Sequence, residues 1–156
     1  MKILLFLNLV ILLVLHSCKN SSNQYDADII IYGGTPAGII AAVQSANMGK
    51  RALIIEPGKY LGGAMSGGLG WSDIGNRETI GGLSRQFFQN VYEYYQNEDV
   101  WNAQSPFSYN PQGNQAIDEG GPMWTFEPKV AQKIFKQMID SAPLKIDIIY
   151  SERLDL

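Results

Sequence analysis

Residues 28–56, DIIIYGGTPAGIIAAVQSANMGKRALIIE, are the stretch that most constrains the fold. An apolar run at 29–32 predicts a buried strand, and a Gly-rich turn follows it directly. A helix of small residues is predicted at 39–48, with Gly49 as its C-terminal stop. A second apolar strand, 52–55, ends in Glu56. A strand, a Gly-rich turn, a helix and a second strand within about 30 residues are the layout of a dinucleotide-binding βαβ unit.

The turn has the chemistry of a phosphate site. Gly33 permits a tight turn, and Gly38 lets the helix lie close to the sheet. The first N–H groups of a helix lack internal partners and can bind a pyrophosphate. Pro36 suits the first helical turn, where its missing N–H has no consequence. The candidate cofactor-binding residues of the turn are Gly33, Gly34, Thr35, Pro36, Ala37 and Gly38.

Two further positions decide how this turn is interpreted. Glu56 lies about 20 residues beyond the turn, where a carboxylate can accept hydrogen bonds from ribose hydroxyls. Thr35 replaces the second glycine of the G-x-G-x-x-G pattern, which lets the backbone approach the phosphates closely. The Thr35 Cβ hinders this close approach, although the Thr35 hydroxyl can donate to a phosphate oxygen. An ordinary βαβ crossover is the alternative interpretation. The strands, the helix and Glu56 in register favour a nucleotide site.

Three segments, YGGTPAGIIAA, LIIEP and LGGAMSGGLGWSD, together resemble one known family. These are the FAD-dependent oxidoreductases with N-terminal GG-x-PAG, EP and GG-x-x-SGG segments, a group that includes relatives described as xanthan-lyase-type flavoproteins. WTFEPKVAQKIFKQMI, from Trp124, also resembles a later segment of that family. The resemblance implies an α/β, Rossmann-like FAD-binding domain with a parallel sheet. It also implies that Gly62 and Gly63 lie beside the FAD diphosphate and ribose, and that Pro57, Met65 and Ser66 belong to the cofactor site.

The N-terminus has the pattern of a bacterial lipoprotein signal. Lys2 is followed by an apolar run at 3–15, which is too short to span a bilayer comfortably, and then by Leu-His-Ser-Cys. We expect a signal peptide at 1–17, lipid on Cys18, and a polar tether at 18–25. Ordinary secretion and a retained anchor are the alternatives. The prediction places the protein outside the cytoplasm, in the periplasm or on the cell surface, held to a membrane through Cys18.

Composition excludes several function classes. Cys18 and His16 are the chain's one cysteine and one histidine, and both lie in or beside the predicted signal. Cys-His and Ser-His-Asp catalysis, disulfides and zinc sites built on Cys or His are therefore excluded for the mature domain. The net charge is −3, and no basic cluster is present, so nucleic-acid binding is not expected.

The remainder of the chain predicts two helices, a strand and two irregular segments. Residues 64–73 are predicted to be a loop wrapped round a ligand; a flexible linker is the alternative, which the large apolar residues of this segment disfavour. A helix at 83–97 would bury Leu83, Phe87, Val91 and Tyr94, and a helix from Pro128 would bury Val130, Ile134 and Met138, widened by Ala131, Phe135 and Ile139. Residues 98–123 lack periodicity and predict an irregular excursion. Residues 146–150 predict a third strand.

Individual side chains suggest further roles. Arg85 can reach a phosphate or a substrate carboxylate, although an ordinary solvated arginine is the alternative. Asp73 and Glu127 are candidates for proton transfer, and Glu127 is also a candidate for a polar contact to flavin or for a carboxylate that stabilises a helix start. Trp101 and its aromatic neighbours in the excursion suit either sugar stacking or packing.

The predicted function is that of an exported flavin-dependent oxidoreductase, which transfers a hydride between a small-molecule or sugar-like substrate and FAD. Family members are several hundred residues long, so we expect 26–156 to form the N-terminal part of an FAD-binding domain that is incomplete at its C-terminus. Three parallel strands with one incomplete face would then expose apolar surface. An NAD-dependent Rossmann dehydrogenase is an alternative, which the Gly62-Gly63 loop disfavours. An inactive truncated lipoprotein that retains the fold is another.

Overall fold

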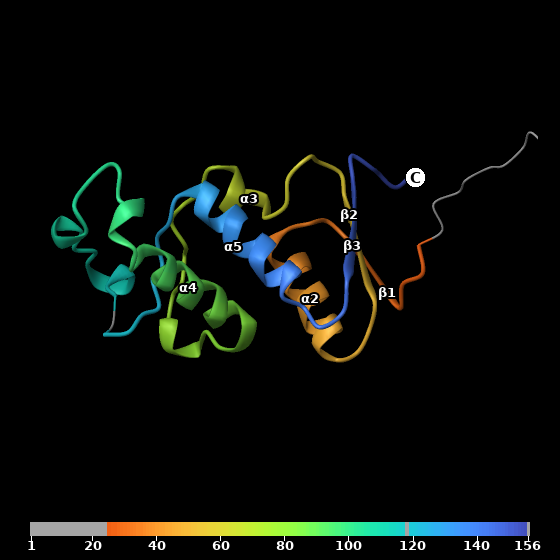
Figure 1. The fold of residues 1–156 in the computed structure, drawn as a ribbon, viewed down its shortest axis with the longest axis horizontal. Helices are drawn as coiled ribbons and strands as arrows, with labels where there is room; N and C mark the ends of the chain where they lie inside the picture. The colour runs from red at the N-terminus through yellow and green to blue at the C-terminus, as the bar shows by residue number, and fades with distance from the viewer. Residues whose placement is uncertain (1–24, 118, 156) are drawn as a thin grey trace, which may run out of the picture.

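The computed structural model describes residues 25–117 and 119–155. The predicted signal peptide 1–17, Cys18 and the tether up to residue 24 lie outside the described residues. The fold is α/β, as predicted, with three parallel strands in the order β1 (Ile29–Tyr32), β2 (Ala52–Glu56) and β3 (Ile146–Tyr150) (Figure 1). Among the described residues, we find no helix with the length and apolar character needed to cross a bilayer.

The first βαβ unit forms as predicted, with one shifted boundary. Helix α2 (Pro36–Asn47) begins three residues before the predicted start, because Thr35 caps it and Pro36 takes the first helical position. Gly49 follows the helix with φ +75°, which fits its predicted role as a stop. The register pairs Ile31 with Ile54, and Ile54 with Ile148, so the three side chains lie on one face of the sheet.

The two faces of the sheet differ in burial. On the face that α2 covers, Ile54 is fully buried and Ala52 is 2% exposed. On the other face Ile30 and Tyr32 of β1 are 64% and 50% exposed, and no described helix covers them (Figure 1), whereas Leu53 of the central strand is buried on that same face. The prediction of a buried first strand is therefore wrong, because β1 lies at the edge of the described sheet. The predicted exposure of apolar surface on an incomplete face is confirmed for the described residues.

Two long helices complete the core. Helix α5 (Pro128–Asp140) buries all six residues of its predicted apolar stripe. Helix α4 (Gly82–Tyr95) ends two residues before the predicted boundary. It buries Phe87 and Val91 as predicted, but Leu83 and Tyr94 are only half-buried, and Tyr95 is buried instead. Phe87 of α4 stacks on Phe135 of α5 with ring centroids 4.4 Å apart. This pair joins the two helices beside the sheet.

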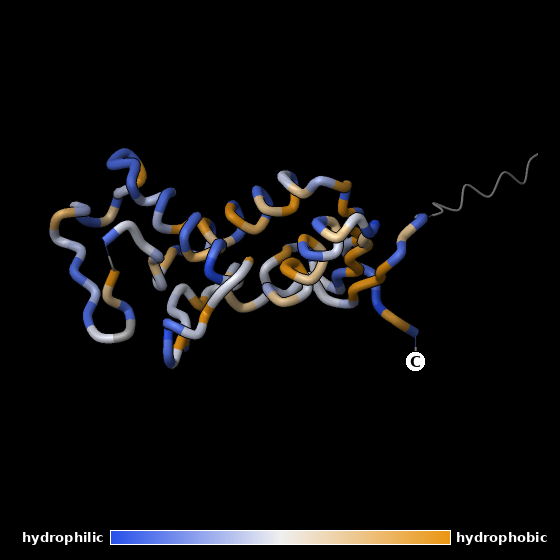
Figure 2. Tube along the Cα trace, turned by 90° about the horizontal axis from the view of Figure 1, so that it is seen from below, coloured by the Kyte–Doolittle hydropathy of each residue, from blue (hydrophilic) through white to orange (hydrophobic). Residues whose placement is uncertain are grey.

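The segments without long helices also contain short ordered elements. Helix α3 (Gly63–Gly67) replaces part of the predicted loop 64–73, because the Ser66 N–H reaches the Gly62 carbonyl at 3.3 Å and closes a helical turn. A single 3-10 turn, η1 (Arg77–Thr79), follows. The excursion 98–123 is irregular, as predicted, and its described residues include three further 3-10 turns: η2 (Glu98–Val100), η3 (Pro106–Ser108) and η4 (Gly113–Gln115). It lies at the end of the molecule opposite the sheet and is mostly hydrophilic, with single hydrophobic residues (Figures 1 and 2).

Candidate functional site

The turn between β1 and α2 requires its glycines, some for their backbone conformation and some for lack of space. Gly33 has φ +102°, a left-handed conformation that favours glycine. A Cβ on Gly38 would lie 2.1 Å from the Gly33 carbonyl oxygen and 3.2 Å from Ile31. Only a glycine at position 38 therefore lets α2 start this close to the strand, which agrees with the sequence prediction.

The start of α2 presents N–H groups without internal partners. The Gly38 N–H donates to the Thr35 hydroxyl at 3.2 Å, which is an N-cap hydrogen bond. The N–H groups of Thr35 and Ala37 make no hydrogen bond within the described part of the chain. Pro36 between them has no N–H. With the positive end of the dipole of a 12-residue helix behind them, these two amides can bind an anion.

The Glu56 carboxylate lies against this turn. Its Oε2 accepts the Gly34 N–H at 2.7 Å, and its Oε1 accepts the Gly58 N–H at 2.5 Å. The two hydrogen bonds fix the carboxylate between the turn and the loop after β2. Each carboxylate oxygen keeps acceptor capacity for a further donor, such as a hydroxyl.

The loop after β2 returns to the same turn and brings the two glycine pairs together. The Gly62 N–H donates to the Gly34 carbonyl at 2.7 Å. A Cβ on Gly63 would lie 3.4 Å from Pro36 and 3.6 Å from Thr35 Cα, so this backbone passes within van der Waals distance of the helix start. The predicted clustering of the turn, Glu56, Gly62 and Gly63 is therefore present in the structure.

Other residues of the predicted set lie beside this cluster with less defined contacts. Ser66 in α3 has a buried hydroxyl oxygen without a hydrogen-bond partner, and a Cβ on Gly62 would lie 1.9 Å from that oxygen. Pro57 is half-buried in the loop that Glu56 anchors. Leu61 and Gly58 were not predicted. A Cβ on Gly34 would lie 2.3 Å from Leu61 Cδ2, and no sequence motif signals that contact.

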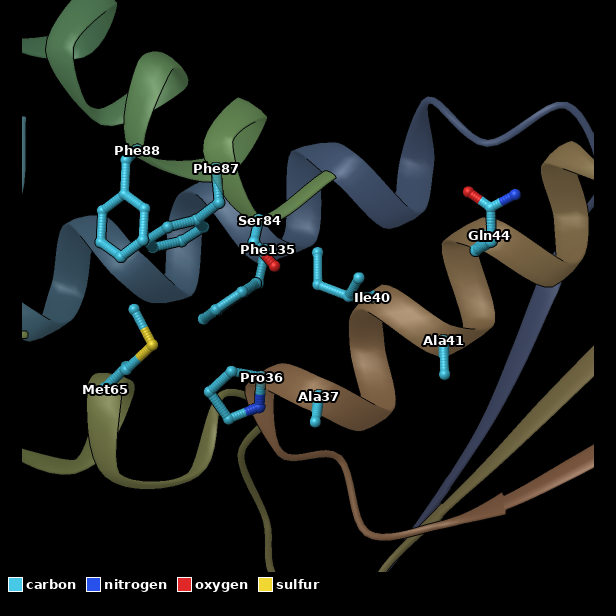
Figure 3. Close-up of a pocket in the computed structure, with 10 residues that line it drawn as sticks. All are labelled: Pro36, Ala37, Ile40, Ala41, Gln44, Met65, Ser84, Phe87, Phe88 and Phe135. Carbon is cyan, nitrogen blue, oxygen red and sulfur yellow. The ribbon is translucent and has the colours of Figure 1, made fainter. Parts of the chain in front are cut away.

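An apolar hollow of about 550 Å³ opens beside the start of α2. Four helices line it, with Met65 pointing in from α3 and Phe135 from α5 (Figure 3). The hollow is formed by Pro36, Ala37, Ile40, Ala41, Gln44, Met65, Ser84, Phe87, Phe88 and Phe135. Because Pro36 and Ala37 belong both to the turn and to the hollow, the anion-binding amides and the apolar surface are parts of one continuous site.

A second hollow of about 660 Å³ adjoins the first through Met65, Ser84 and Phe88. Asp73 lines it, so the structure places this predicted acid beside the hollow. The Arg85 guanidinium donates instead to the Ile80 carbonyl at 3.4 Å. Within the described residues no group of three or more Asp, Glu, His or Cys side chains is placed to hold a metal ion.

Glu127 lies outside both hollows, at the start of α5 and next to the C-terminal end of α4. The Tyr95 hydroxyl donates to Glu127 Oε2 at 3.3 Å and accepts the Glu127 N–H at 3.1 Å. Burial is the main cause that raises the pKa of Tyr95 from 10.0 to about 12, and the adjacent Glu127 charge adds to it. The structure thus places Glu127 at a helix start, with Tyr95 and Lys129 as its partners, and not in either hollow.

Comparison with known proteins gives a family match over most of the chain and a sequence match over a shorter stretch. A model of the FAD dependent oxidoreductase family matches residues 28–154. The mitochondrial dihydrolipoyl dehydrogenase of Caenorhabditis elegans is 40% identical over 45 residues, which cover 29% of this chain and 9% of that protein.

Solved structures are similar at low identity. Thermovibrio ammonificans THI4 has a TM-score of 0.43 at 14% identity, over 94% of this chain and 46% of that one. CabE, an aromatic hydroxylase from angucycline biosynthesis, has a TM-score of 0.47 at 16% identity, over 81% of this chain and 24% of that one. The chain therefore spans less than half the length of each of these proteins.

The family match carries the assignment, and it covers β1, the Gly-rich turn, Glu56, the hollow and β3. The family's cofactor is FAD. The narrower resemblance to xanthan-lyase-type flavoproteins stays a prediction. The chain belongs to the FAD dependent oxidoreductase family.

Proposed function

We propose that this chain forms the FAD-binding part of an exported flavin-dependent oxidoreductase that transfers a hydride between a small-molecule or sugar-like substrate and FAD. The observation that carries the proposal is the position of Glu56, whose carboxylate is fixed against the turn that offers free amides. An acceptor beside a helix start matches the two parts of an adenosine diphosphate, the ribose hydroxyls and the phosphates.

The residues present fit the adenosine diphosphate half of FAD. The Thr35 and Ala37 amides would hold the diphosphate, and Glu56 would accept hydrogen bonds from the ribose. The Thr35 hydroxyl accepts the Gly38 N–H, and its own proton remains available to a phosphate oxygen. Gly62 and Gly63 would line the other side, where the unpartnered Ser66 hydroxyl is also placed.

The apolar hollow fits the flavin half. Its volume of about 550 Å³ is within the range of small-molecule sites, roughly 300–1,000 Å³. Met65 and Ile40, which are partly exposed, would pack on the ring system and exclude water, above the buried phenylalanines. Bound FAD supplies the hydride chemistry itself, and this chain's residues bind and orient it. Asp73, at the adjoining hollow, is our candidate for holding a proton near the substrate.

The decisive experiment measures FAD, ADP and FMN binding to the purified chain by calorimetry, with Glu56→Gln and the control Glu93→Gln. Glu93 is an exposed glutamate on α4 away from both hollows. Loss of a hydrogen bond to a charged group is worth about 1.5–3 kcal/mol, so Glu56→Gln should weaken FAD and ADP about 10- to 100-fold. FMN lacks the adenosine ribose, and its affinity should change little. Wild-type protein that binds neither FAD nor ADP, or equal effects of both substitutions, would refute the proposal.

Export rests on the sequence pattern at residues 1–18, and we propose that lipid is attached to Cys18. Metabolic labelling with a palmitate analogue in a bacterial host tests this directly. Wild-type protein should carry the label and fractionate with membranes, and Cys18→Ser should lose the label and leave the membrane fraction. An unlabelled wild-type protein would contradict the lipid anchor while leaving FAD binding untouched.

A further inference from the structure

A separate pocket of about 290 Å³ lies at the C-terminal end of α4, under the irregular segment 98–123. It shares no lining residue with the two hollows of the candidate flavin site. Half of its lining residues are aromatic, and we call it the aromatic pocket; its rings are Tyr92, Tyr95, Trp101, Phe107 and Tyr109, and Glu98 lies among them. Neither the family match nor the flavin site accounts for it.

Hydrogen bonds engage the polar side-chain atoms of three of the five rings of the aromatic pocket. Trp101 Nε1 donates to the Tyr95 carbonyl at 2.9 Å. The Tyr95 hydroxyl is paired with Glu127, and the Tyr109 hydroxyl with Thr125. Ring centroids lie 5.1 Å apart for Tyr95 and Trp101, and 5.4 Å apart for Trp101 and Tyr109. The polar atoms of Tyr95, Trp101 and Tyr109 are therefore already engaged within the chain, and these three residues offer a ligand mainly their ring surfaces.

The electrostatics of the aromatic pocket favour a positive charge. No Lys, Arg or His is among the residues that line it. The Glu98 carboxylate forms no ion pair within the described part of the chain. The C-terminal end of the 14-residue helix α4 adds the negative end of a helix dipole. The faces of the aromatic rings carry a negative electrostatic potential, which also attracts a cation.

These properties separate two classes of ligand that aromatic residues can bind. A sugar needs hydrogen-bond donors and acceptors around its hydroxyl groups, and the Trp101, Tyr95 and Tyr109 polar atoms are already engaged. An alkylated ammonium group needs no hydrogen bonds and is attracted by ring faces and a carboxylate. The chain already makes such a contact nearby, with Lys133 Nζ 4.8 Å from the Tyr94 ring centroid.

We propose that the aromatic pocket binds an organic cation with a methylated ammonium head, in contact with Trp101 and Phe107 and paired with Glu98. Phe107 is 88% exposed, an unusual state for a large hydrophobic side chain, and a ligand in the pocket would cover it. The proposal does not depend on FAD binding. Of the two roles suggested by the sequence for these aromatics, packing describes Trp101 and Tyr109, and sugar stacking is disfavoured by their engaged polar atoms.

The test titrates the full chain with choline and with 3,3-dimethylbutan-1-ol, which has the same shape without the charge. Binding is followed by NMR through the indole N–H signals, with Trp101 assigned from a Trp101→Phe variant. We expect choline to shift the Trp101 signal, and the neutral isostere to bind at least tenfold more weakly. Phe107→Leu and Glu98→Gln should each weaken choline several-fold, and the control Glu93→Gln should not. Because Phe107 and Glu98 are exposed, neither substitution should affect folding.

Three results would overturn the proposal. These are the absence of a Trp101 shift at millimolar choline, equal binding of the neutral isostere, and tighter binding of methyl glucoside than of choline. A free ammonium compound and a lipid headgroup share this chemistry. Cosedimentation of the chain with phosphatidylcholine vesicles, but not with phosphatidylglycerol vesicles, would assign the lipid source, and binding of choline without cosedimentation would assign the free compound.

Discussion

Gly38→Ala tests the close approach of α2 to the strand, on which the candidate site depends. In most helices this change is stabilising, because alanine has the higher helix propensity by about 1 kcal/mol. Here the new Cβ would lie 2.1 Å from the Gly33 carbonyl oxygen, whereas ordinary contacts begin at 3.4 Å. The obstacle is backbone and cannot rotate away, so the helix start has to move by about 1 Å.

Overpacking of this kind costs about 1–3 kcal/mol. After the gain of about 1 kcal/mol in helix propensity, we expect Gly38→Ala to lower the free energy of unfolding by up to about 2 kcal/mol. The displaced Thr35 and Ala37 amides should also weaken FAD binding. Urea denaturation followed by tryptophan fluorescence measures the first effect, because Trp124 is fully buried and reports on the core. Calorimetry measures the second.

Gly67→Ala is the matched control, because Gly67 is also helical and a Cβ there would meet nothing within 4 Å. This variant should be neutral, or more stable by up to about 1 kcal/mol. A Gly38→Ala protein as stable as the wild type, with unchanged FAD affinity, would refute the steric argument.

Three further outcomes follow from burial and charge. Phe135→Ala should lower the free energy of unfolding by about 3–5 kcal/mol in urea denaturation, because its ring is 1% exposed and stacked on a neighbour. In the same assay, Ile54→Val should lower the free energy of unfolding by about 0.5–1.5 kcal/mol, because the Ile54 side chain is 0% exposed. Ile30→Val should change it very little, because Ile30 is 64% exposed. Equal losses of stability in the two variants would contradict the assigned faces. The pKa of Tyr95 is raised from 10.0 to about 12, so its contribution to stability is present below pH 10 and is lost as the pH rises through 12. Tyr95→Phe should flatten that alkaline loss, as measured by thermal unfolding at several pH values.

The local part of the fold was predictable because short-range chemistry decides it. The strand–turn–helix–strand order, the Gly49 stop and the α5 stripe all depend on residues close together in the sequence. The clustering of Gly33, Glu56 and Gly63 was also predictable, because the family resemblance placed these motifs around one ligand.

The remainder depends on distant contacts that the pattern does not encode. Tyr95 replaces Tyr94 in the core because Glu127, 32 positions away, positions the Tyr95 hydroxyl. The apolar hollow is formed by four helices, and no single stretch shows their convergence. An apolar run such as that of β1 predicts a buried strand wherever it occurs in a sequence. The exposure of β1 follows instead from its place at the edge of the described sheet.

The two hydrogen bonds of the Glu56 carboxylate have a consequence for the energetics of ligand capture. A free glutamate side chain loses about 1.5–2 kcal/mol of rotamer entropy when it is immobilised. Here the backbone of Gly34 and Gly58 has already immobilised it, so this loss belongs to folding and is not repeated at each encounter with a nucleotide. A rigid acceptor of this kind raises affinity without adding any contact to the complex.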